Sequence, residues 1–204
     1  MHALTFALVV ASAGLAHAAE SPDLAAIHEP AASEPAPRDS SAISGARETF
    51  ERAILERDQG NLTKSMDLMR HACEVSSRSA GENAFETSLY QANLAFILIQ
   101  LEDDAGGAQL LKQCVPAFRL RYGATHENTL RLRTSLANAL ANSGDTVATL
   151  AQLDTVDAGC RSRAGPPSPE EHFAGTTRAS LLTGRGKRLE ARALLLALLA
   201  REDD

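Results

Sequence analysis

Residues of matching size recur every 42 positions along most of this chain. Alanine recurs at Ala53, Ala95, Ala137 and Ala179. A second column is small in every copy, at Ser65, Gly107, Thr149 and Ala191, and a third is large and apolar, at Met69, Leu111, Leu153 and Leu195. Glycines recur at Gly81, Gly123 and Gly165, and at Gly60, Gly144 and Gly186, where Glu102 takes the place of the missing member. A period of this length is typical of stacked structural repeats, each of which buries its apolar face only against its neighbours.

The composition favours helices within each repeat. The apolar residues are mostly Ala and Leu, which lose little rotamer freedom in a helix, whereas aromatic residues make up 4% and Trp is absent. We therefore predict an all-α fold in which each repeat forms two antiparallel helices joined by a tight turn, with the small residues allowing close approach. The predicted helices cover residues 46–58, 61–78, 84–101, 104–121, 126–142, 145–161, 169–183 and 187–202. In each repeat the first helix is called helix A and the second helix B.

Several local signals mark the helix ends. Asn83 with Glu86, and Ser168 with Glu171, have the spacing of a capping box, and Asn61 and Asp145 follow turn glycines as expected N-caps. Pro116 falls inside a predicted helix, where it removes an amide donor and is expected to kink the helix.

One repeat carries a family signature. The stretch from Gly123 through His126, Thr129 and Leu130, followed by Leu136-Ala137 and Gly144, resembles the 42-residue, kinesin-light-chain-like form of the tetratricopeptide repeat (TPR) family, with Glu127 where proline is usual. The resemblance covers residues 45–204 and implies a right-handed α-solenoid of about four helix-turn-helix repeats. It also implies a protein that binds other proteins or peptides, although the fold itself does not specify which.

The residues before the repeats predict export. Residues 1–18 have an apolar run ending in Ala16-His17-Ala18, which is typical of a signal peptide cleaved after Ala18. Residues 19–44, rich in Pro, Ala, Ser and Glu, are expected to form a disordered leader. No later apolar run is long enough to span a bilayer, so we expect a periplasmic or secreted protein with no membrane span after signal cleavage.

Charge and motif content argue against several function classes. A net charge of −6 gives no field that attracts nucleic acid. The segment Gly184-Arg-Gly186-Lys187 lacks the spacing of a phosphate-binding loop, and His126-Glu127 lacks the second histidine of a zinc protease motif. We therefore expect no enzyme activity, no metal and no cofactor.

Three cysteines leave one thiol unpaired whatever the disulfide pattern. The repeat geometry places Cys114 and Cys160 too far apart for a disulfide, whereas it does not exclude a disulfide between Cys73 and Cys114. Buried thiols that pack as small apolar groups are the favoured interpretation. Arg119 and Arg121, with Arg161 and Arg163 at the equivalent positions, are expected to complement helix dipoles.

The family resemblance places recognition on the A helices, which line the concave face of such an array. The exposed positions it implies carry Arg47, Leu89, Arg131 and Phe173 in one column and Ile54, Phe96, Asn138 and Ser180 in another. Asn93 and Arg131 match two positions of the carboxylate clamp found in some relatives, but Phe50, Ile54 and Ser135 at the other three leave that clamp incomplete. The candidate peptide-binding residues are Arg47, Asn93, Phe96, Arg131 and Asn138.

The final predicted helix is apolar almost all round, which suggests self-association through Leu195, Leu198 and Leu199. The leading hypothesis is a non-enzymatic adaptor exported to the cell envelope that binds a protein or peptide. One alternative is a structural subunit of an envelope assembly that oligomerises, for instance as a homodimer, through this helix. A second alternative is a redox-responsive protein that uses an unpaired cysteine.

Overall fold

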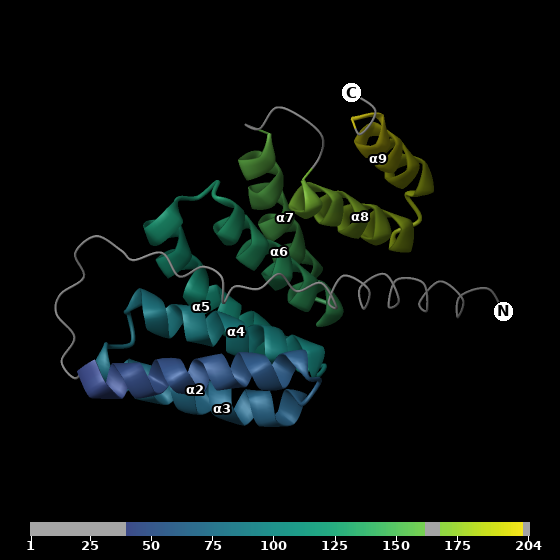
Figure 1. Ribbon diagram of the computed structural model, residues 1–204. Coiled ribbons are helices and arrows are strands. Elements are labelled where there is room, and N and C mark those ends of the chain that lie inside the picture. The colour runs from purple at the N-terminus through teal and green to yellow at the C-terminus, as the bar shows by residue number, and fades with distance from the viewer. Residues whose placement is uncertain (1–39, 162–167, 202–204) are drawn as a thin grey trace. The chain divides into compact units, whose positions relative to one another are not determined.

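The computed structural model describes residues 40–161 and 168–201, which form eight α-helices and no strand (Figure 1). The helices are α2 (Ser40–Asp58), α3 (Leu62–Ser79), α4 (Phe85–Gln100), α5 (Asp104–Tyr122), α6 (Glu127–Asn142), α7 (Thr146–Cys160), α8 (Pro169–Gly184) and α9 (Arg188–Ala200). The predicted signal peptide, and the predicted leader as far as residue 39, lie outside the described residues.

The predicted helices agree with the observed ones except at the start of the first. Helix α2 begins at Ser40, so residues 40–44 are helical and the leader predicted over 19–44 extends too far. Its first turns make their own side-chain bonds, in which the Ser44 hydroxyl donates to the Ser40 carbonyl and the Thr49 hydroxyl to the Gly45 carbonyl. The serine-rich sequence there lacks apolar periodicity, so periodicity alone does not predict this part of the helix.

Consecutive helices pack as four antiparallel pairs. The pairs are α2 with α3, α4 with α5, α6 with α7, and α8 with α9, and each pair also packs against the next. The two small-residue columns meet inside these pairs. The Ser65 hydroxyl donates to the Ala53 carbonyl at 2.6 Å, and a Cβ at Gly107 would lie 3.0 Å from the Ala95 carbonyl oxygen. Helix B therefore approaches helix A so closely that a large side chain would not fit at these positions.

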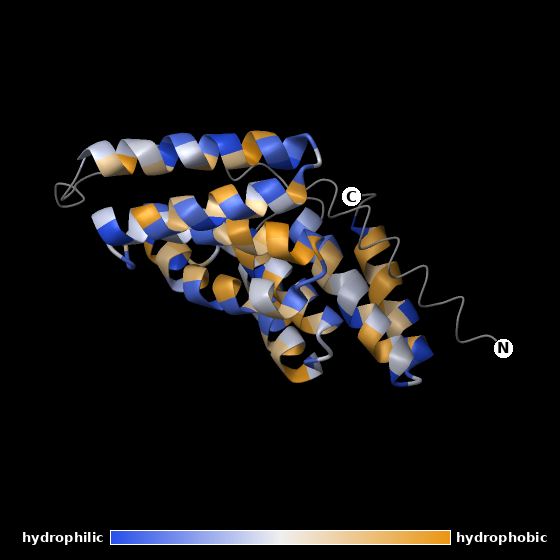
Figure 2. Cartoon of the chain, turned by 90° about the horizontal axis from the view of Figure 1, so that it is seen from below, coloured by the Kyte–Doolittle hydropathy of each residue, from blue (hydrophilic) through white to orange (hydrophobic). Residues whose placement is uncertain are grey.

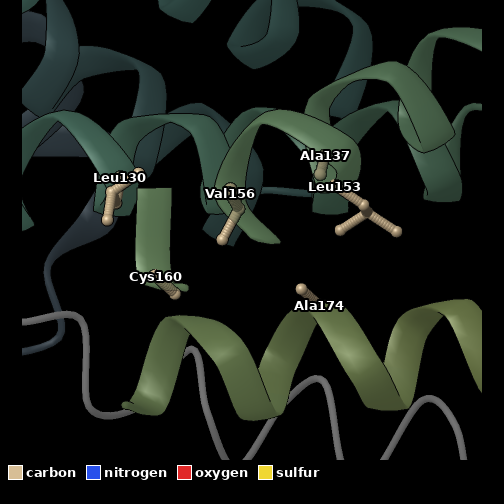
Figure 3. Close-up of a cluster of buried hydrophobic side chains, with 6 residues drawn as sticks. All are labelled: Leu130, Ala137, Leu153, Val156, Cys160 and Ala174. Carbon is tan, nitrogen blue, oxygen red and sulfur yellow. The ribbon is translucent and has the colours of Figure 1, made fainter. Parts of the chain in front are cut away.

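Large residues of the third column fill the space between successive pairs. Met69, Leu111 and Leu153 are fully buried. Figure 2 shows that hydrophobic and hydrophilic residues occur on the same helices. Figure 3 shows one such cluster between α6, α7 and α8, made of Leu130, Ala137, Leu153, Val156, Cys160 and Ala174. The core is therefore continuous from one repeat to the next, as expected for a stacked array.

The turn between helices A and B requires a left-handed backbone. Gly60, Gly144 and Gly186 have φ between 77° and 81°, and Glu102 adopts the same conformation with φ of 65°. Glu102 therefore stands where glycine is preferred, because an L side chain is strained at positive φ.

The predicted caps are only partly confirmed. The side chains of Ser168 and Asp145 accept hydrogen bonds from the amides of Glu171 and Ala148, as expected. Asn61 occupies the N-cap position but its side chain makes no cap bond, since its amide donates to Glu56 instead. The prediction of Asn83 as a cap is wrong, because Ala84 is the N-cap of α4.

Helix α5 runs without interruption through Pro116, so the proline does not end it. The ring removes the amide that would donate to the Lys112 carbonyl, and Pro116 is exposed, which lets water reach that carbonyl.

Candidate functional site

The four A helices, α2, α4, α6 and α8, lie side by side. The rings of Phe50 on α2 and Tyr90 on α4 stack with their centroids 4.5 Å apart, and Arg131 on α6 lies 3.9 Å from Glu170 on α8. Helices α4 and α6 also contact each other. Residues 42 positions apart therefore project from neighbouring A helices in the same direction, and together they form one surface, called here the A-helix face.

Four of the five predicted binding residues keep solvent-accessible surface on this face. Arg47 is exposed and pairs with Glu51 on the same helix at 3.2 Å. Phe96 and Asn138, at equivalent positions of α4 and α6, are half-buried, as is Arg131. These side chains combine a cation, an aromatic ring and an amide, which suits contacts with both the side chains and the main chain of a peptide.

Asn93 departs from the prediction of an exposed binding residue, because it is 1% exposed. Its amide nitrogen donates to the Leu89 carbonyl at 3.0 Å, while its Oδ1 has no hydrogen-bond partner among the described residues. Phe50, Ile54 and Leu89 are also buried. Phe173, from the first column, packs against the cluster of Figure 3. Counting repeat positions could not reveal this burial, since it depends on the side chains of the adjacent helices.

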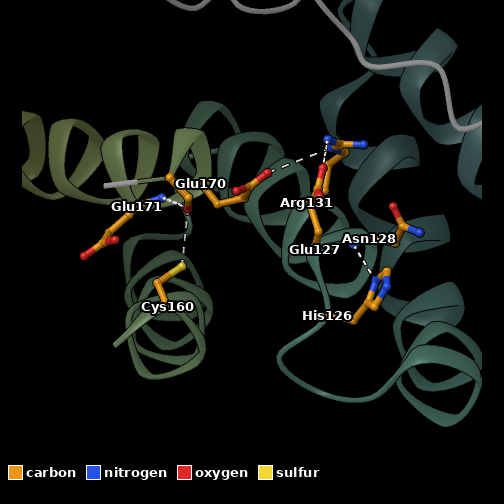
Figure 4. A network of polar contacts seen from close by, with 8 residues as sticks. His126, Glu127, Asn128, Arg131, Cys160, Glu170 and Glu171 are labelled. Atoms are coloured by element: carbon orange, nitrogen blue, oxygen red, sulfur yellow. Dashed lines mark hydrogen bonds and ion pairs between the residues drawn. The ribbon is translucent and has the colours of Figure 1, made fainter. Parts of the chain in front are cut away.

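Arg131 lies between two carboxylates. Its Nη2 donates to Glu127 Oε1 at 2.5 Å, and its Nε lies 3.9 Å from Glu170 Oε1 (Figure 4). Glu170 is buried in the first turn of α8, and the repeat pattern does not assign it to this surface. A carboxylate in a first helical turn is usual beside the helix dipole, so its sequence position alone gave no sign of this ion pair. Any acidic ligand of Arg131 would have to compete with both glutamates.

Arg133, two residues beyond Arg131 on α6, is a second residue that the sequence did not single out. Its Nη1 donates to Gln152 on α7 at 2.9 Å, and its Nε is buried without a hydrogen-bond partner among the described residues. Burial, and to a lesser degree the charge of Arg119, lowers the pKa of Arg133. The side chain thus ties α6 to α7 within one repeat.

Helix ends near α4 and α5 form an aromatic cluster. The Phe85 ring lies 5.1 Å from that of Phe118 and 5.5 Å from that of Tyr122, and the Arg121 guanidinium lies 5.5 Å from the Phe85 centroid. Arg121, expected to act on a helix dipole, therefore also makes a cation–π contact. Arg119 lies in the last turn of α5 as expected, whereas Arg163 is outside the described residues.

The predicted self-association residues separate into two groups. Leu195 and Leu199 are 37% and 54% exposed on α9. Leu198 instead packs against Gly175 of α8. The two are so close that a Cβ at Gly175 would overlap with Leu198 Cδ1. Leu198 is therefore half-buried, and of the three predicted self-association residues it is the one that α8 covers most closely.

None of the three cysteines, all of which lie in the described residues, forms a disulfide. Cys114 and Cys160 are buried and Cys73 is half-buried. Burial raises the pKa of Cys73 and of Cys114 to about 12, and for Cys114 proximity to Cys73 adds a smaller effect. Because the thiolate is the reactive form, both groups are poor nucleophiles near neutral pH.

Across residues 40–161 and 168–201, no group of three His, Cys, Asp or Glu side chains is arranged to hold a metal ion. None of the helices in those ranges combines the length and the apolar character required to cross a bilayer.

Comparisons with known proteins identify the fold. No protein-family profile matches this sequence, and no curated protein shows significant sequence similarity to it. Solved structures do match. BtubC (BKLC) from P. vanneervenii aligns over 78% of this chain with a TM-score of 0.69 and 14% identity. A putative kinesin light chain with nearly identical TPR-like repeats from Podosopora anserina, and a single-residue variant of it, align over 78% with TM-scores of 0.65 and 0.66 and 19% identity.

The chain has a TPR-like repeat fold. The predicted all-α, right-handed solenoid of helix-turn-helix repeats is thus confirmed. The alignment spans 63% of the length of the BtubC structure and about three quarters of the two Podosopora anserina chains, at 75% and 74%. At 14–19% identity this similarity shows the fold alone.

Proposed function

We propose that this protein is a non-enzymatic adaptor of the cell envelope that binds a protein or peptide segment on its A-helix face. The observation that carries the proposal is that Arg47, Phe96, Arg131 and Asn138 remain accessible on three successive A helices, α2, α4 and α6. A surface built from several parallel helices offers an extended row of contacts, which suits an extended segment of another chain.

The chemistry of the face indicates how such a segment would be held. Phe96 offers apolar area and Asn138 can both donate to and accept from a peptide main chain. Arg131 is already balanced by Glu127 and Glu170, so it contributes orientation more than net attraction for an acidic group. We therefore expect a ligand that contributes an apolar side chain near Phe96 and main-chain groups near Asn138.

Export is part of the same proposal and rests on residues 1–18 alone. Cleavage after Ala18 would leave Ala19 as the mature N-terminus. Production of the full chain in a bacterium, fractionation of the periplasm and N-terminal sequencing test this. Full-length protein retained in the cytoplasm would contradict it.

Binding is tested with a library of displayed peptides selected on the mature protein. We expect the selected peptides to bind Phe96→Ala and Asn138→Ala at least tenfold more weakly than the wild type in fluorescence anisotropy. Leu120→Ala, at a position of helix α5 that is 90% exposed, is the matched control and should bind normally. The proposal fails if no peptide is enriched, or if the control loses as much affinity as the two A-helix variants.

The redox alternative is not favoured by the thiols observed. Cys114 and Cys160 are buried, and the raised pKa of Cys73 and Cys114 leaves little thiolate at neutral pH.

A further inference from the structure

Two arginines lie beside each other where α6 packs against α5 and α7. Arg133 on α6 is half-buried, and its Nη1 donates to the uncharged Gln152 of α7 at 2.9 Å. Arg119 is exposed in the last turn of α5. Neither side chain pairs with a carboxylate in the part of the chain that the structure describes. We call Arg119 and Arg133 the arginine pair.

The packing of α5 on α6 brings the two cations together. The Thr129 hydroxyl of α6 donates to the Phe118 carbonyl at 3.3 Å, which holds the end of α5 against the first turns of α6. Arg119 directly follows Phe118, and Arg133 lies four residues after Thr129, which is about one turn along the same face of α6. Burial lowers the pKa of Arg133, and the positive charge of Arg119 adds a smaller effect in the same direction. The two guanidinium groups are therefore close enough to repel each other.

This repulsion is unusual in a chain whose net charge is −6. On the neighbouring surfaces the chain supplies its own carboxylates, since Arg131 lies beside two glutamates and Arg178 beside two aspartates. A guanidinium keeps its proton near neutral pH, so the arginine pair does not relieve its repulsion by deprotonation. Arg133 also has a buried Nε without a hydrogen-bond partner among the described residues, so its donors are only partly used.

The arginine pair is separate from the A-helix face. Residues two positions apart on a helix project about 200° apart, so Arg131 and Arg133 point to opposite sides of α6. Arg131 faces Glu170 of α8, whereas Arg133 faces Gln152 of the B helix α7. A ligand of the arginine pair would therefore leave the A-helix face free.

We propose that Arg119 and Arg133 bind a phosphate group on the B-helix side of α6. Near neutral pH a phosphate carries between one and two negative charges and several strong acceptor oxygens, which suits two neighbouring guanidinium groups better than the single charge of a carboxylate does. Gln152 is a positioning residue, because its bond to Nη1 orients the Arg133 side chain. The same chemistry fits free phosphate and a phosphate ester of a larger molecule. This site goes beyond the proposed peptide binding and does not depend on it.

The test is a titration of the protein with inorganic phosphate, followed by NMR of the arginine Nε–H groups. Sodium chloride keeps the ionic strength constant, because salt screens exposed charges. We expect the Arg119 and Arg133 signals to shift together and to saturate. Arg119→Gln should weaken binding about tenfold, as should Arg133→Gln, since each removes a charge and its hydrogen bonds. Arg119 is exposed, so its variant leaves the core intact, and circular dichroism verifies the fold of both.

Arg70→Gln is the matched control, because Arg70 is an exposed arginine on the B helix α3, and it should bind phosphate normally. Glycerol 3-phosphate separates the two sources of the phosphate group. Binding as tight as that of phosphate indicates an ester ligand, and clearly weaker binding indicates free phosphate. Arg119 and Arg133 signals that do not respond to phosphate overturn the proposal. Acetate binding as tight as phosphate, or an equal loss of affinity in Arg70→Gln, also overturns it, because either result indicates a general effect of positive charge.

Discussion

At the scale of single residues, the array depends on positions where side-chain size or backbone angle is fixed by geometry. Ser65 and Gly107 lie against the main chain of Ala53 and Ala95, so their small size follows from helix proximity. Backbone angle is fixed in the turn between helices A and B, where Gly60, Gly144, Gly186 and Glu102 all have a left-handed backbone. Both sets of residues could be found in the sequence because the requirement for a small side chain, or for a left-handed backbone, recurs in every 42-residue repeat.

Glu102 is the one member of its column that is not glycine, and it should be a site of strain. A left-handed conformation costs an L residue roughly 1–2 kcal/mol, partly offset in glycine by the entropy of its unfolded state. Glu102→Gly should therefore raise the free energy of unfolding by about 0.5–1 kcal/mol in urea titration. Gly144→Ala, the same turn one repeat later, should lower it by a comparable amount. Equal signs for the two variants would show that the backbone angle is not the cause.

At the scale of elements, capping residues in the sequence predicted some helix starts correctly and others not. Ser168 and Asp145 cap their helices through their own side chains. Asn83 does not, because the chain enters α4 one residue later at Ala84. Helix α2 begins at Ser40, six residues before the predicted start, and hydrophobic periodicity does not detect this first part because the segment is rich in serine.

Substitution of Pro116 tests how much the missing amide destabilises helix α5. Restoring the missing amide should let α5 form its bond to the Lys112 carbonyl, and the exposed side chain makes no demand on packing. Pro116→Ala should raise the free energy of unfolding by about 1–3 kcal/mol. Urea titration followed by circular dichroism measures it, with Ala117→Ser as a control at the neighbouring position. No gain would mean that neighbouring helices require the bend that proline favours.

At the scale of the whole molecule, stability should be uneven along the array. Helix α4 buries residues along most of its length, whereas Ala191 is the one buried residue of α9. In repeat proteins each unit is held by its neighbours, so a unit with fewer buried contacts opens more easily.

Hydrogen exchange followed by mass spectrometry should reveal this order. Amides of α9 should exchange first and those of α4 to α6 last. Exchange in α4 that is as fast as in α9 would contradict the expected order.

The candidate site shows where prediction from sequence reached its limit. The resemblance to the TPR family implied that Arg47, Phe96, Arg131 and Asn138 lie on the A helices at exposed positions, and all four keep accessible surface. Asn93 follows the same rule but is buried, and Glu170 follows no repeating pattern yet lies beside Arg131. Exposure and ion pairing depend on side chains that adjacent helices contribute, and these vary from repeat to repeat.

The sequence by itself determined the repeat length, the pairing of helices and the positions of the turns, because these depend on local propensity and on a spacing that recurs. Only the tertiary structure decided which residues of a face are accessible. Leu198 packs against α8 because Gly175 has no side chain, while Leu195, Leu196 and Leu199 stay exposed. The physical reason is that burial is a property of two surfaces in contact, and the period specifies the position of a residue but not the shape of what it meets.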